Sequence, residues 1–286
     1  MKQIIILTIA AAWWIQTCAQ VDYSNDSLRV ATAEWRIDSL DGFVYKSYHF
    51  GEGELFCSAQ HLFILEIPAS SPRRLVFTHD TLLTVVSTLA ERSEAFAAVN
   101  GSFFDMDLGN PICYLRIDGT QLGENTPGKN DSVNRKYYQY ATLALRRGRP
   151  CLSVPDSNRF CEERMKEKNI MTAGPMLLHN GEMVPQRDDR TFVTRRHNRT
   201  ALGIRPDGTT LLVVADGRFK HKAEGLSLPE LERVMRWLGC TDAINLDGGG
   251  SSTMYIKDNG VVNYPSDNNR HDHDGQRPVS NAILLL

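Results

Sequence analysis

The chain has 286 residues, long enough for one large domain or two small ones, and its 42% hydrophobic and 23% charged residues are ordinary for a globular protein. Its formal net charge of −2 does not favour the broad basic surface that grips nucleic acid, so we expect no nucleic-acid partner. No C-x-x-C pair occurs, so a zinc ribbon is not indicated, and Cys151 could pair with Cys161 in an oxidising compartment.

The first nineteen residues have the pattern of a secretion signal. Lys2 is followed by an apolar run over residues 4–15, about 12 residues and too short to span a bilayer. Thr17-Cys18-Ala19 then offers a small-residue cleavage site. We therefore expect residues 1–19 to be removed and the mature protein to be secreted or periplasmic, unless a lipid on Cys18 anchors it at the cell envelope.

The first half of the chain is expected to be rich in strands. Residues 80–93 are predicted to be helical, because apolar residues recur at helical spacing behind Asp80 or Thr81 as N-cap. The polar run 123–136 is expected to be a long loop. Strands are predicted at residues 30–37, 42–50, 60–67, 73–77, 95–99, 113–118 and 140–146.

The second half carries clearer local signals. Asn180-Gly181 predicts a hairpin turn, and a second hairpin is expected where residues 199–204 and 209–215 flank Pro206-Asp-Gly. Ser227 and Glu230 form a capping box for a helix over residues 227–238. Residues 186–196 are expected to be a polar loop, and residues 243–246 and 278–286 to be strands. Since strands outnumber helices and are often joined by hairpins, we predict an α+β fold: a largely antiparallel or mixed sheet with a few packed helices in a single catalytic domain.

The stretch most suggestive of chemistry follows the strand at residues 243–246. Asp247 precedes three glycines and Ser251, which together offer a carboxylate, free backbone N–H groups and hydroxyls. Such a set suits an anionic or sugar-like ligand. No G-x-S-x-G elbow and no P-loop signature occurs, so those two active-site types are not indicated.

Four polar loops lie at the ends of expected strands: residues 100–105, 197–200, 216–218 and 247–253. Polar groups at strand ends cost free energy unless they are paired or solvated, so four of them together favour a shared site. Within these loops, Asp216 and Asp247 are candidates for acting on a sugar carbon.

Arginine offers a planar fork that matches phosphate oxygens. Arg199 is the leading candidate for a phosphate ligand, followed by Arg218, Arg116 and Arg277. The same loops hold polar groups that could bind hydroxyls or a developing anion: His197, Asn100, Thr200, Gly249, Gly250 and Ser251.

The sequence resembles the phosphodiester glycosidase family over residues 95–286, whereas residues 20–94 resemble no known family. The resemblance is carried by NGSFFD at 100–105, RTALGI at 199–204, ADGR at 215–218 and the block ending in DGGGSSTM at 254. It implies a secreted bacterial member that hydrolyses the glycosidic bond of a sugar 1-phosphodiester. It also implies a site made of Asn100, Arg199, Thr200, Asp216, Asp247, Gly249, Gly250 and Ser251.

Neither the residues nor the resemblance decide which of the two acids attacks, and no cofactor is indicated. The expected ligand is a carbohydrate or phospho-glycan of the envelope or extracellular space. Two alternatives stay open. The chain could bind a phospho-glycan without turning it over, or the Asp/His run at residues 271–274 could hold a divalent ion in a phosphodiesterase that cleaves the P–O bond.

Overall fold

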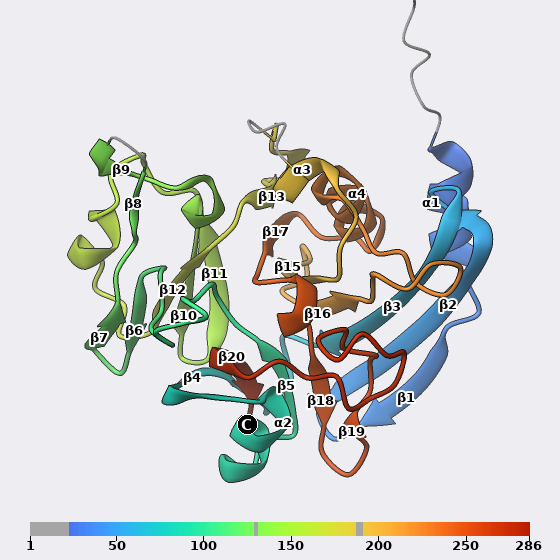
Figure 1. The fold of residues 1–286 in the computed structure, drawn as a ribbon, viewed down its shortest axis with the longest axis horizontal. Coiled ribbons are helices and arrows are strands. Elements are labelled where there is room, and N and C mark those ends of the chain that lie inside the picture. Colours follow the sequence, from blue (N-terminus) through green and yellow to red (C-terminus); the bar gives the residue numbers. More distant parts are fainter. Residues whose placement is uncertain (1–22, 129–130, 187–190) are drawn as a thin grey trace, which may run out of the picture.

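The computed structural model describes residues 23–128, 131–186 and 191–286, so the expected signal peptide and Cys18 lie outside the described part. Three antiparallel sheets pack around a common interior (Figure 1). The largest has the strand order β1-β2-β3-β16-β15-β17-β13-β14. Its strands are β1 (Arg36–Leu40), β2 (Phe43–Leu55), β3 (Ser58–Ile67), β16 (Thr210–Ala215), β15 (Arg199–Ile204), β17 (Asp242–Asn245), β13 (Met176–His179) and β14 (Glu182–Met183).

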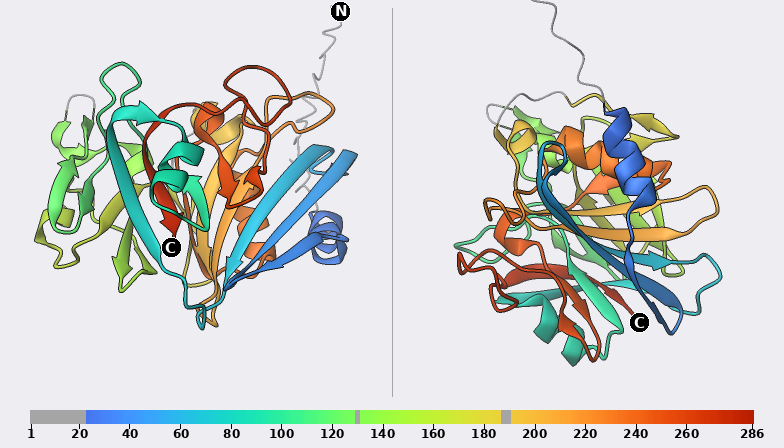
Figure 2. Two further views of the ribbon diagram at one scale, coloured as in Figure 1. Left: turned by 90° about the horizontal axis from the view of Figure 1, so that it is seen from below. Right: turned by 90° about the vertical axis from the view of Figure 1, so that its right-hand side faces the viewer.

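The two other main sheets have five strands each and lie beside the large one (Figure 2). One has the order β11-β10-β12-β6-β7 and the other β19-β18-β5-β20-β4. The first contains β6 (Leu115–Ile117), β7 (Thr120–Gly123), β10 (Ala141–Arg146), β11 (Arg149–Ser153) and β12 (Ile170–Ala173). The second contains β4 (Leu75–Thr84), β5 (Ala97–Asn100), β18 (Met254–Ile256), β19 (Gly260–Val261) and β20 (Val279–Leu285), and a separate pair joins β8 (Pro127–Gly128) to β9 (Asp131–Arg135).

Helices cover the outer surfaces of these sheets. The best defined is α4 (Leu228–Trp237), where the Ser227 N–H donates to Glu230 Oε2 at 2.8 Å and the Glu230 N–H donates back to Ser227 Oγ at 3.4 Å. Its apolar face packs on the large sheet in one buried cluster with β3, β15 and β16. The other helices are α1 (Ser24–Thr32), α2 (Val86–Arg92) and α3 (Thr191–Thr194), with 3-10 turns η1 (Tyr137–Gln139), η2 (Cys161–Arg164) and η3 (Gly249–Ser251).

The main core lies between the three sheets. Leu65 of the large sheet, Leu143 of the second and Ile283 of the third belong to one cluster and are fully buried. Strand β16 is buried along its whole length, which explains its unbroken apolar sequence. Strands from the N-terminal third pair with strands far along the chain, β3 with β16 and β4 with β20. The predicted α+β class and single domain are therefore confirmed.

Two predicted elements in the N-terminal third were wrong. The strand expected over residues 30–37 begins only at Arg36, because residues up to Thr32 belong to helix α1, which buries Val30 and contacts α4, where the Arg233 guanidinium lies 4.2 Å from the Tyr23 ring centre. The helix expected over residues 80–93 begins only at Val86, because residues up to Thr84 continue β4 along β20. In both cases long-range packing overrode the local apolar spacing.

The remaining local predictions mostly hold. The hairpin at Asn180-Gly181 joins β13 to β14, and both turn residues have positive φ. The polar runs expected to be loops contain short elements, β8 and β9 in the first and α3 in the second, while residues 187–190 lie outside the described part. Cys151 and Cys161 are both free thiols in the structure, so the possible pairing is not formed there.

Candidate active site

The four polar loops meet at one end of the large sheet. Ala215, the residue before Asp216, is the antiparallel partner of Arg199. The Leu246 N–H donates to the Thr200 carbonyl at 2.8 Å, and the Asp247 N–H donates to the Gly101 carbonyl at 3.0 Å. Strand β5 belongs to a different sheet from β15, β16 and β17, so the segment after β17 joins two sheets. The expected convergence of these loops is present.

The glycine loop, residues 247–251, is pressed against the backbone that leads into β15. The Gly249 N–H donates to the Asn198 carbonyl at 2.9 Å, and Gly249 has φ +62°. A Cβ on Gly248 would lie 2.8 Å from that same carbonyl oxygen. Because this neighbour is backbone and cannot swing away, Gly248 has to be glycine for the loop to take this path.

Two guanidiniums lie directly over the glycine loop. A Cβ on Gly249 would be 2.6 Å from Arg218 Nη2, and a Cβ on Gly250 would be 2.5 Å from Arg277 Nη2. Arg277 is held by Asp267, whose Oδ1 accepts from Arg277 Nε at 2.8 Å. Burial lowers the pKa of Arg218, and the positive charge of Arg277 lowers it further. Asp267 offsets part of this positive charge, and the two guanidiniums together offer N–H donors suited to an anion.

Asp247 is the carboxylate of this cluster. It is partly exposed, and its Oδ1 accepts the Gly248 N–H at 2.9 Å. Burial raises the pKa of the Asp247 carboxyl to about 6, and the nearby Arg277 and Arg218 guanidiniums limit that rise. The group is therefore mainly ionised at neutral pH, and its pKa suits a base that accepts a proton.

Asp216 occupies a different environment. It is fully buried, and its two oxygens accept from Asn263 Nδ2 at 2.9 Å and from the Tyr264 N–H at 3.0 Å. Burial raises the pKa of the Asp216 carboxyl to about 8. A substrate cannot reach a carboxyl enclosed in this way, so the structure does not support the expectation that Asp216 acts directly on a sugar carbon. Asp216 instead fixes the path of residues 263–264.

Arg199 is likewise turned into the protein. Its Nε donates to the Leu226 carbonyl at 2.8 Å, and its Nη2 donates to the carbonyls of Phe192 at 2.8 Å and Arg195 at 3.0 Å. The residue is 2% exposed, and burial lowers the pKa of its guanidinium to about 10. This placement differs from the expectation that Arg199 binds phosphate, because its bonded N–H groups are already used to hold the backbone.

Asn100 and Thr200 link the glycine loop to its surroundings. Thr200 Oγ1 donates to Asn100 Oδ1 at 2.7 Å, and Asn100 Nδ2 donates to the Asp247 carbonyl at 2.7 Å. Asn100 Oδ1 also accepts from the Thr253 N–H at 3.2 Å. Both side chains are buried, as is Ser251. The three residues expected to contact substrate hydroxyls are therefore enclosed by the protein.

His197 stands at the edge of the cationic cluster and is partly exposed. Burial and the charges of Arg199, Arg218 and Arg195 lower the pKa of its imidazole to about 4. It is therefore neutral at physiological pH and can act as a hydrogen-bond donor or acceptor for a ligand held by the arginines.

Sequence reasoning ranked Arg277 among secondary candidates and missed its partner Asp267. The only signal for Arg277 was its place just before the closing strand, while Asp267 lies in an irregular polar stretch without a motif. Among residues 23–128, 131–186 and 191–286, no group of three or more His, Cys, Asp or Glu side chains is arranged to hold a metal ion. The Asp/His run at residues 271–274 thus forms no such group there.

A sequence profile of phosphodiester glycosidases matches residues 93–286. The chain belongs to the phosphodiester glycosidase family. It is 36% identical to human N-acetylglucosamine-1-phosphodiester alpha-N-acetylglucosaminidase over 221 residues, which is 70% of this chain and 39% of the human protein. It is 39% identical to the mouse protein of the same name over 98 residues, 33% of this chain and 18% of that protein. The chain thus matches well under half the length of either relative.

The fold of this family member resembles solved structures. The catalytic domain of the zebrafish N-acetylglucosamine-1-phosphodiester alpha-N-acetylglucosaminidase, described as auto-inhibited by its pro-peptide, superposes with a TM-score of 0.67 at 18% identity and covers 88% of this chain and 87% of that domain. A hypothetical protein from Synechocystis gives a TM-score of 0.60 at 14% identity, with 88% and 63% covered. Within the described residues, no helix is long and apolar enough to cross a membrane.

Proposed function

We propose that this chain hydrolyses the glycosidic bond of a sugar 1-phosphodiester, with N-acetylglucosamine as the sugar and an envelope or extracellular glycan as the carrier. The observation that carries the proposal is the pair of guanidiniums, Arg218 and Arg277, over the glycine loop that begins at Asp247. Cations beside a carboxylate match a phosphodiester next to the carbon that water attacks. The names of the human and mouse relatives supply the sugar.

In the proposed reaction, Asp247 accepts a proton from a water molecule as that water attacks the anomeric carbon. The bond between this carbon and the bridging oxygen breaks, and the oxygen leaves with the phosphate as a phosphomonoester. Arg218 and Arg277 stabilise the charge that develops on the leaving phosphate. Because a charge-stabilised phosphomonoester is a fair leaving group, no second carboxylate has to act as a strong acid. The neutral His197 can hydrogen-bond the leaving oxygen.

The buried residues take positioning roles in this scheme. Thr200 and Asn100 fix the backbone of Asp247, and Arg199 fixes the segment that carries Arg195 and His197. Removing them is expected to lower activity by displacing the groups that meet the substrate. Such a displacement differs from the removal of a guanidinium, which takes away a charge that contacts phosphate.

The test is hydrolysis of N-acetylglucosamine 1-(methyl phosphate) in water enriched in oxygen-18. Cleavage at the anomeric carbon places the label in the free sugar and leaves methyl phosphate unlabelled. Asp247→Asn is expected to abolish turnover, and Arg218→Gln to lower kcat/KM about a hundred-fold. Arg146→Gln is the control, since Arg146 pairs with Glu167 on an exposed part of the second sheet. Turnover that survives both Asp247→Asn and Arg218→Gln would reject this site.

The same assay separates the two alternative functions. Oxygen-18 in the phosphate group, with that phosphate retained on the sugar, would indicate a phosphodiesterase. Loss of this activity when a chelator is added would show that it depends on a metal ion. Thermal stabilisation by the ester without any product would indicate a phospho-glycan binding protein.

Export of the mature chain is part of the proposal and rests on the pattern of residues 1–19. Expression of the full chain followed by mass spectrometry of the mature N-terminus tests it. A start near Gln20 supports cleavage, a lipidated Cys18 supports anchoring, and an intact Met1 on an intracellular product contradicts both.

A further inference from the structure

A cavity of about 260 Å³ lies between the second and third sheets. It is lined from the second sheet by the turn Arg147-Gly148, which joins β10 to β11, and from the third sheet by Arg74 and the first residues of β4. Val76 and Ile117 add partly exposed apolar side chains to the lining. The volume is just below the range of about 300–1,000 Å³ for drug-sized ligands, so the cavity suits a smaller molecule.

The cavity is remote from the glycine loop. Leu75, which also lines it, pairs with Leu285, whereas Asn100 of the candidate active site pairs with Ala282. Three residues of β20 separate these two positions, a distance of about 10 Å along the strand. Because β20 is buried along its whole length, a molecule in the cavity cannot extend through the sheet to the glycine loop. A ligand bound here would therefore be a second ligand of the protein.

Five arginines flank the β10–β11 turn and the start of β4: Arg73, Arg74, Arg146, Arg147 and Arg149. Arg73 and Arg146 form ion pairs with Asp41 and Glu167, and Arg149 donates to two backbone carbonyls. Within the described residues, the guanidiniums of Arg74 and Arg147 have no hydrogen-bond or ion-pair partner. Both residues are exposed and line the cavity. The unpaired guanidiniums of this group are thus the two that face the cavity.

The turn that carries Arg147 has a residue that its backbone does not favour. Arg147 has φ +53° and Gly148 has φ +74°, the pattern of a hairpin turn that prefers Asn, Asp or Gly at its first position. The similar turns Asp118-Gly119 and Asn180-Gly181 follow this preference. Another exception, Phe56-Cys57, is explained by the buried Phe56 ring, which stacks on Trp237.

Arg147 has no such packing to explain its position. In the described part of the chain, its side chain makes no hydrogen bond, ion pair or ring contact, although its backbone is in the left-handed region that a long side chain disfavours. A residue that breaks a local rule without a compensating contact indicates a functional role for its side chain. For Arg147, the space that its side chain lines is the cavity.

The backbone holds the stems of the two arginines side by side. A Cβ on Gly148 would lie 2.5 Å from Arg74 Cβ, and the Gly148 carbonyl accepts the Leu75 N–H at 3.0 Å. Arg74 is fixed on its other side, where it exchanges backbone hydrogen bonds of 2.8 and 2.9 Å with Leu286. Two guanidiniums on stems this close repel each other, and an anion that contacts both removes the repulsion.

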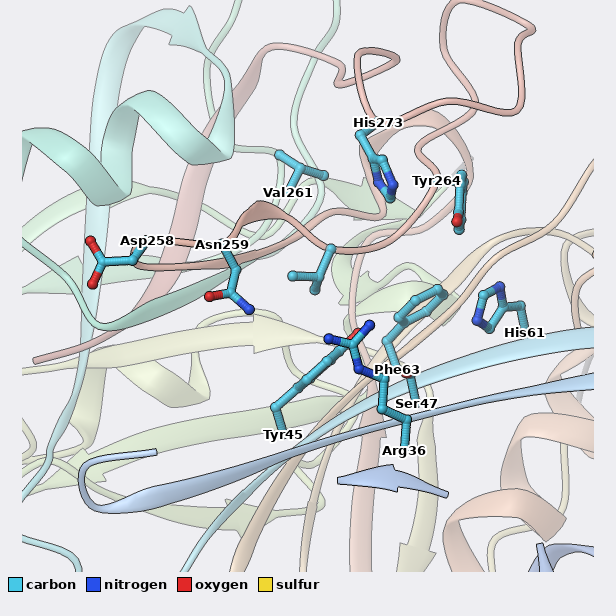
Figure 3. A pocket seen from close by; sticks show the side chains of 11 residues that line it. Arg36, Tyr45, Ser47, His61, Phe63, Asp258, Asn259, Val261, Tyr264 and His273 are labelled. Carbon is cyan, nitrogen blue, oxygen red and sulfur yellow. The ribbon is translucent and has the colours of Figure 1, made fainter. Parts of the chain in front are cut away.

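Little negative charge offsets these two cations. Asp118 is the acidic residue of the lining, and its Oδ1 accepts from Asn169 Nδ2 at 3.3 Å and not from either arginine. The larger cavity beside β1–β3, of about 410 Å³, has a different charge balance. Arg36 points into that hollow (Figure 3), but its Nη2 lies 3.3 Å from Asp38 Oδ2. The smaller cavity is therefore the better anion site of the two.

We propose that the cavity between the β10–β11 turn and β4 binds a small organic anion. Its phosphate or carboxylate lies between Arg74 and Arg147, because both head groups match the planar fork of a guanidinium. Its apolar part lies against Val76 and Ile117. The site is separate from the glycine loop, so the inference does not depend on the proposed function.

The experiment measures binding of phenylphosphonate and of benzoate by NMR, which requires no turnover. The dissociation constant is taken from the shifts of the Leu75, Gly148 and Asn169 backbone amides, so that binding at the glycine loop is not counted. Benzyl alcohol supplies the apolar part without the charge, and methylphosphonate supplies the charge with little apolar surface. The tighter of the two aromatic anions identifies the head group that the site prefers.

Arg74→Gln and Arg147→Asn are the test variants. Asparagine at position 147 keeps the turn, because Asn180 holds the same position in the β13–β14 hairpin. The melting temperature of Arg147→Asn should therefore equal or exceed that of the wild type, which shows that any loss of binding is not unfolding. Arg146→Gln is the matched control, since Arg146 is an exposed arginine one residue before Arg147 and is paired with Glu167.

We expect saturable shifts with at least one aromatic anion and weaker binding of both benzyl alcohol and methylphosphonate. Arg74→Gln and Arg147→Asn should each weaken binding about ten-fold, as for loss of one charged hydrogen bond. Arg146→Gln should bind like the wild type. The site would be overturned by the absence of saturable shifts at these amides, by equal affinity in the wild type and both test variants, or by benzyl alcohol binding as tightly as the anions.

Discussion

Replacing Asp216 by asparagine should change how the stability of the protein depends on pH. Burial raises the pKa of this carboxyl from 3.8 to about 8 in the folded protein. Above the unfolded pKa, the folded state keeps a proton that the unfolded chain has released, so rising pH favours unfolding. Each pH unit costs about 1.4 kcal/mol, which gives about 4 kcal/mol of lost stability at pH 7. The contribution is fully present below pH ~4 and is lost by pH ~8.

Asp216→Asn removes this titration but introduces a constant penalty. Its amide N–H would face one of the two N–H donors, from Asn263 or Tyr264, that the carboxyl now accepts. That mismatch costs about 1–3 kcal/mol at every pH. We therefore expect the stability of the wild type relative to Asp216→Asn to fall by about 3 kcal/mol between pH 5 and pH 7.

Urea unfolding at pH 5, 6, 7 and 8 measures this difference directly. Asp207→Asn is the control. Hydrogen bonding to Thr209 lowers the pKa of Asp207, so that group is ionised in both states above pH 5 and its replacement should shift all four values equally. A wild-type advantage over Asp216→Asn that stays constant from pH 5 to pH 7, or grows, would show that Asp216 is ionised in the folded protein. The account of its environment would then be wrong.

Three further outcomes follow from the site and its surroundings. As pH falls through about 6, kcat/KM on the methyl phosphodiester should decline ten-fold per pH unit because Asp247 becomes protonated, and a flat profile from pH 5 to 8 would exclude it as the base. Gly248→Ala should cost about 1–3 kcal/mol in urea unfolding, since its Cβ would meet the Asn198 carbonyl oxygen at 2.8 Å, and a cost under about 0.5 kcal/mol would contradict that contact. Glu162→Gln should cost about 3–5 kcal/mol by the same measurement, because it leaves the fully buried Arg135 without its carboxylate, whereas an unchanged stability would show that water reaches the pair.

The sequence was sufficient where local interactions decide the structure. The cap of α4 needs only Ser227 and Glu230 in the same turn, and the hairpin of β15 and β16 needs only a tight turn between two apolar runs. The convergence of the four polar loops could also be predicted from the sequence, because each loop begins or ends a buried strand. Helix α1 could not be predicted in this way, since its packing against α4 joins residues about 200 apart in the chain.

The roles within the candidate site could not be read from residue types. Arg199 and Arg218 both belong to motifs, RTALGI and ADGR, and either guanidinium suits a phosphate. What separates them is the surroundings: three backbone carbonyls accept from Arg199, while Arg218 is exposed over Gly249. Those carbonyls belong to residues 192, 195 and 226, and no spacing in the sequence predicts their approach.

The residues with the strongest motif signal are largely the ones that the protein encloses. Asn100, Thr200 and Asp216 each bond to a backbone or side chain from a distant segment, and a substitution at any of them would shift the glycine loop or the segment at 263–267. Groups that meet a ligand at a surface can be supplied from several positions, as Arg218 and Arg277 illustrate. A buried side chain with two or three fixed partners has no such freedom. The motif therefore marks the framework of the site.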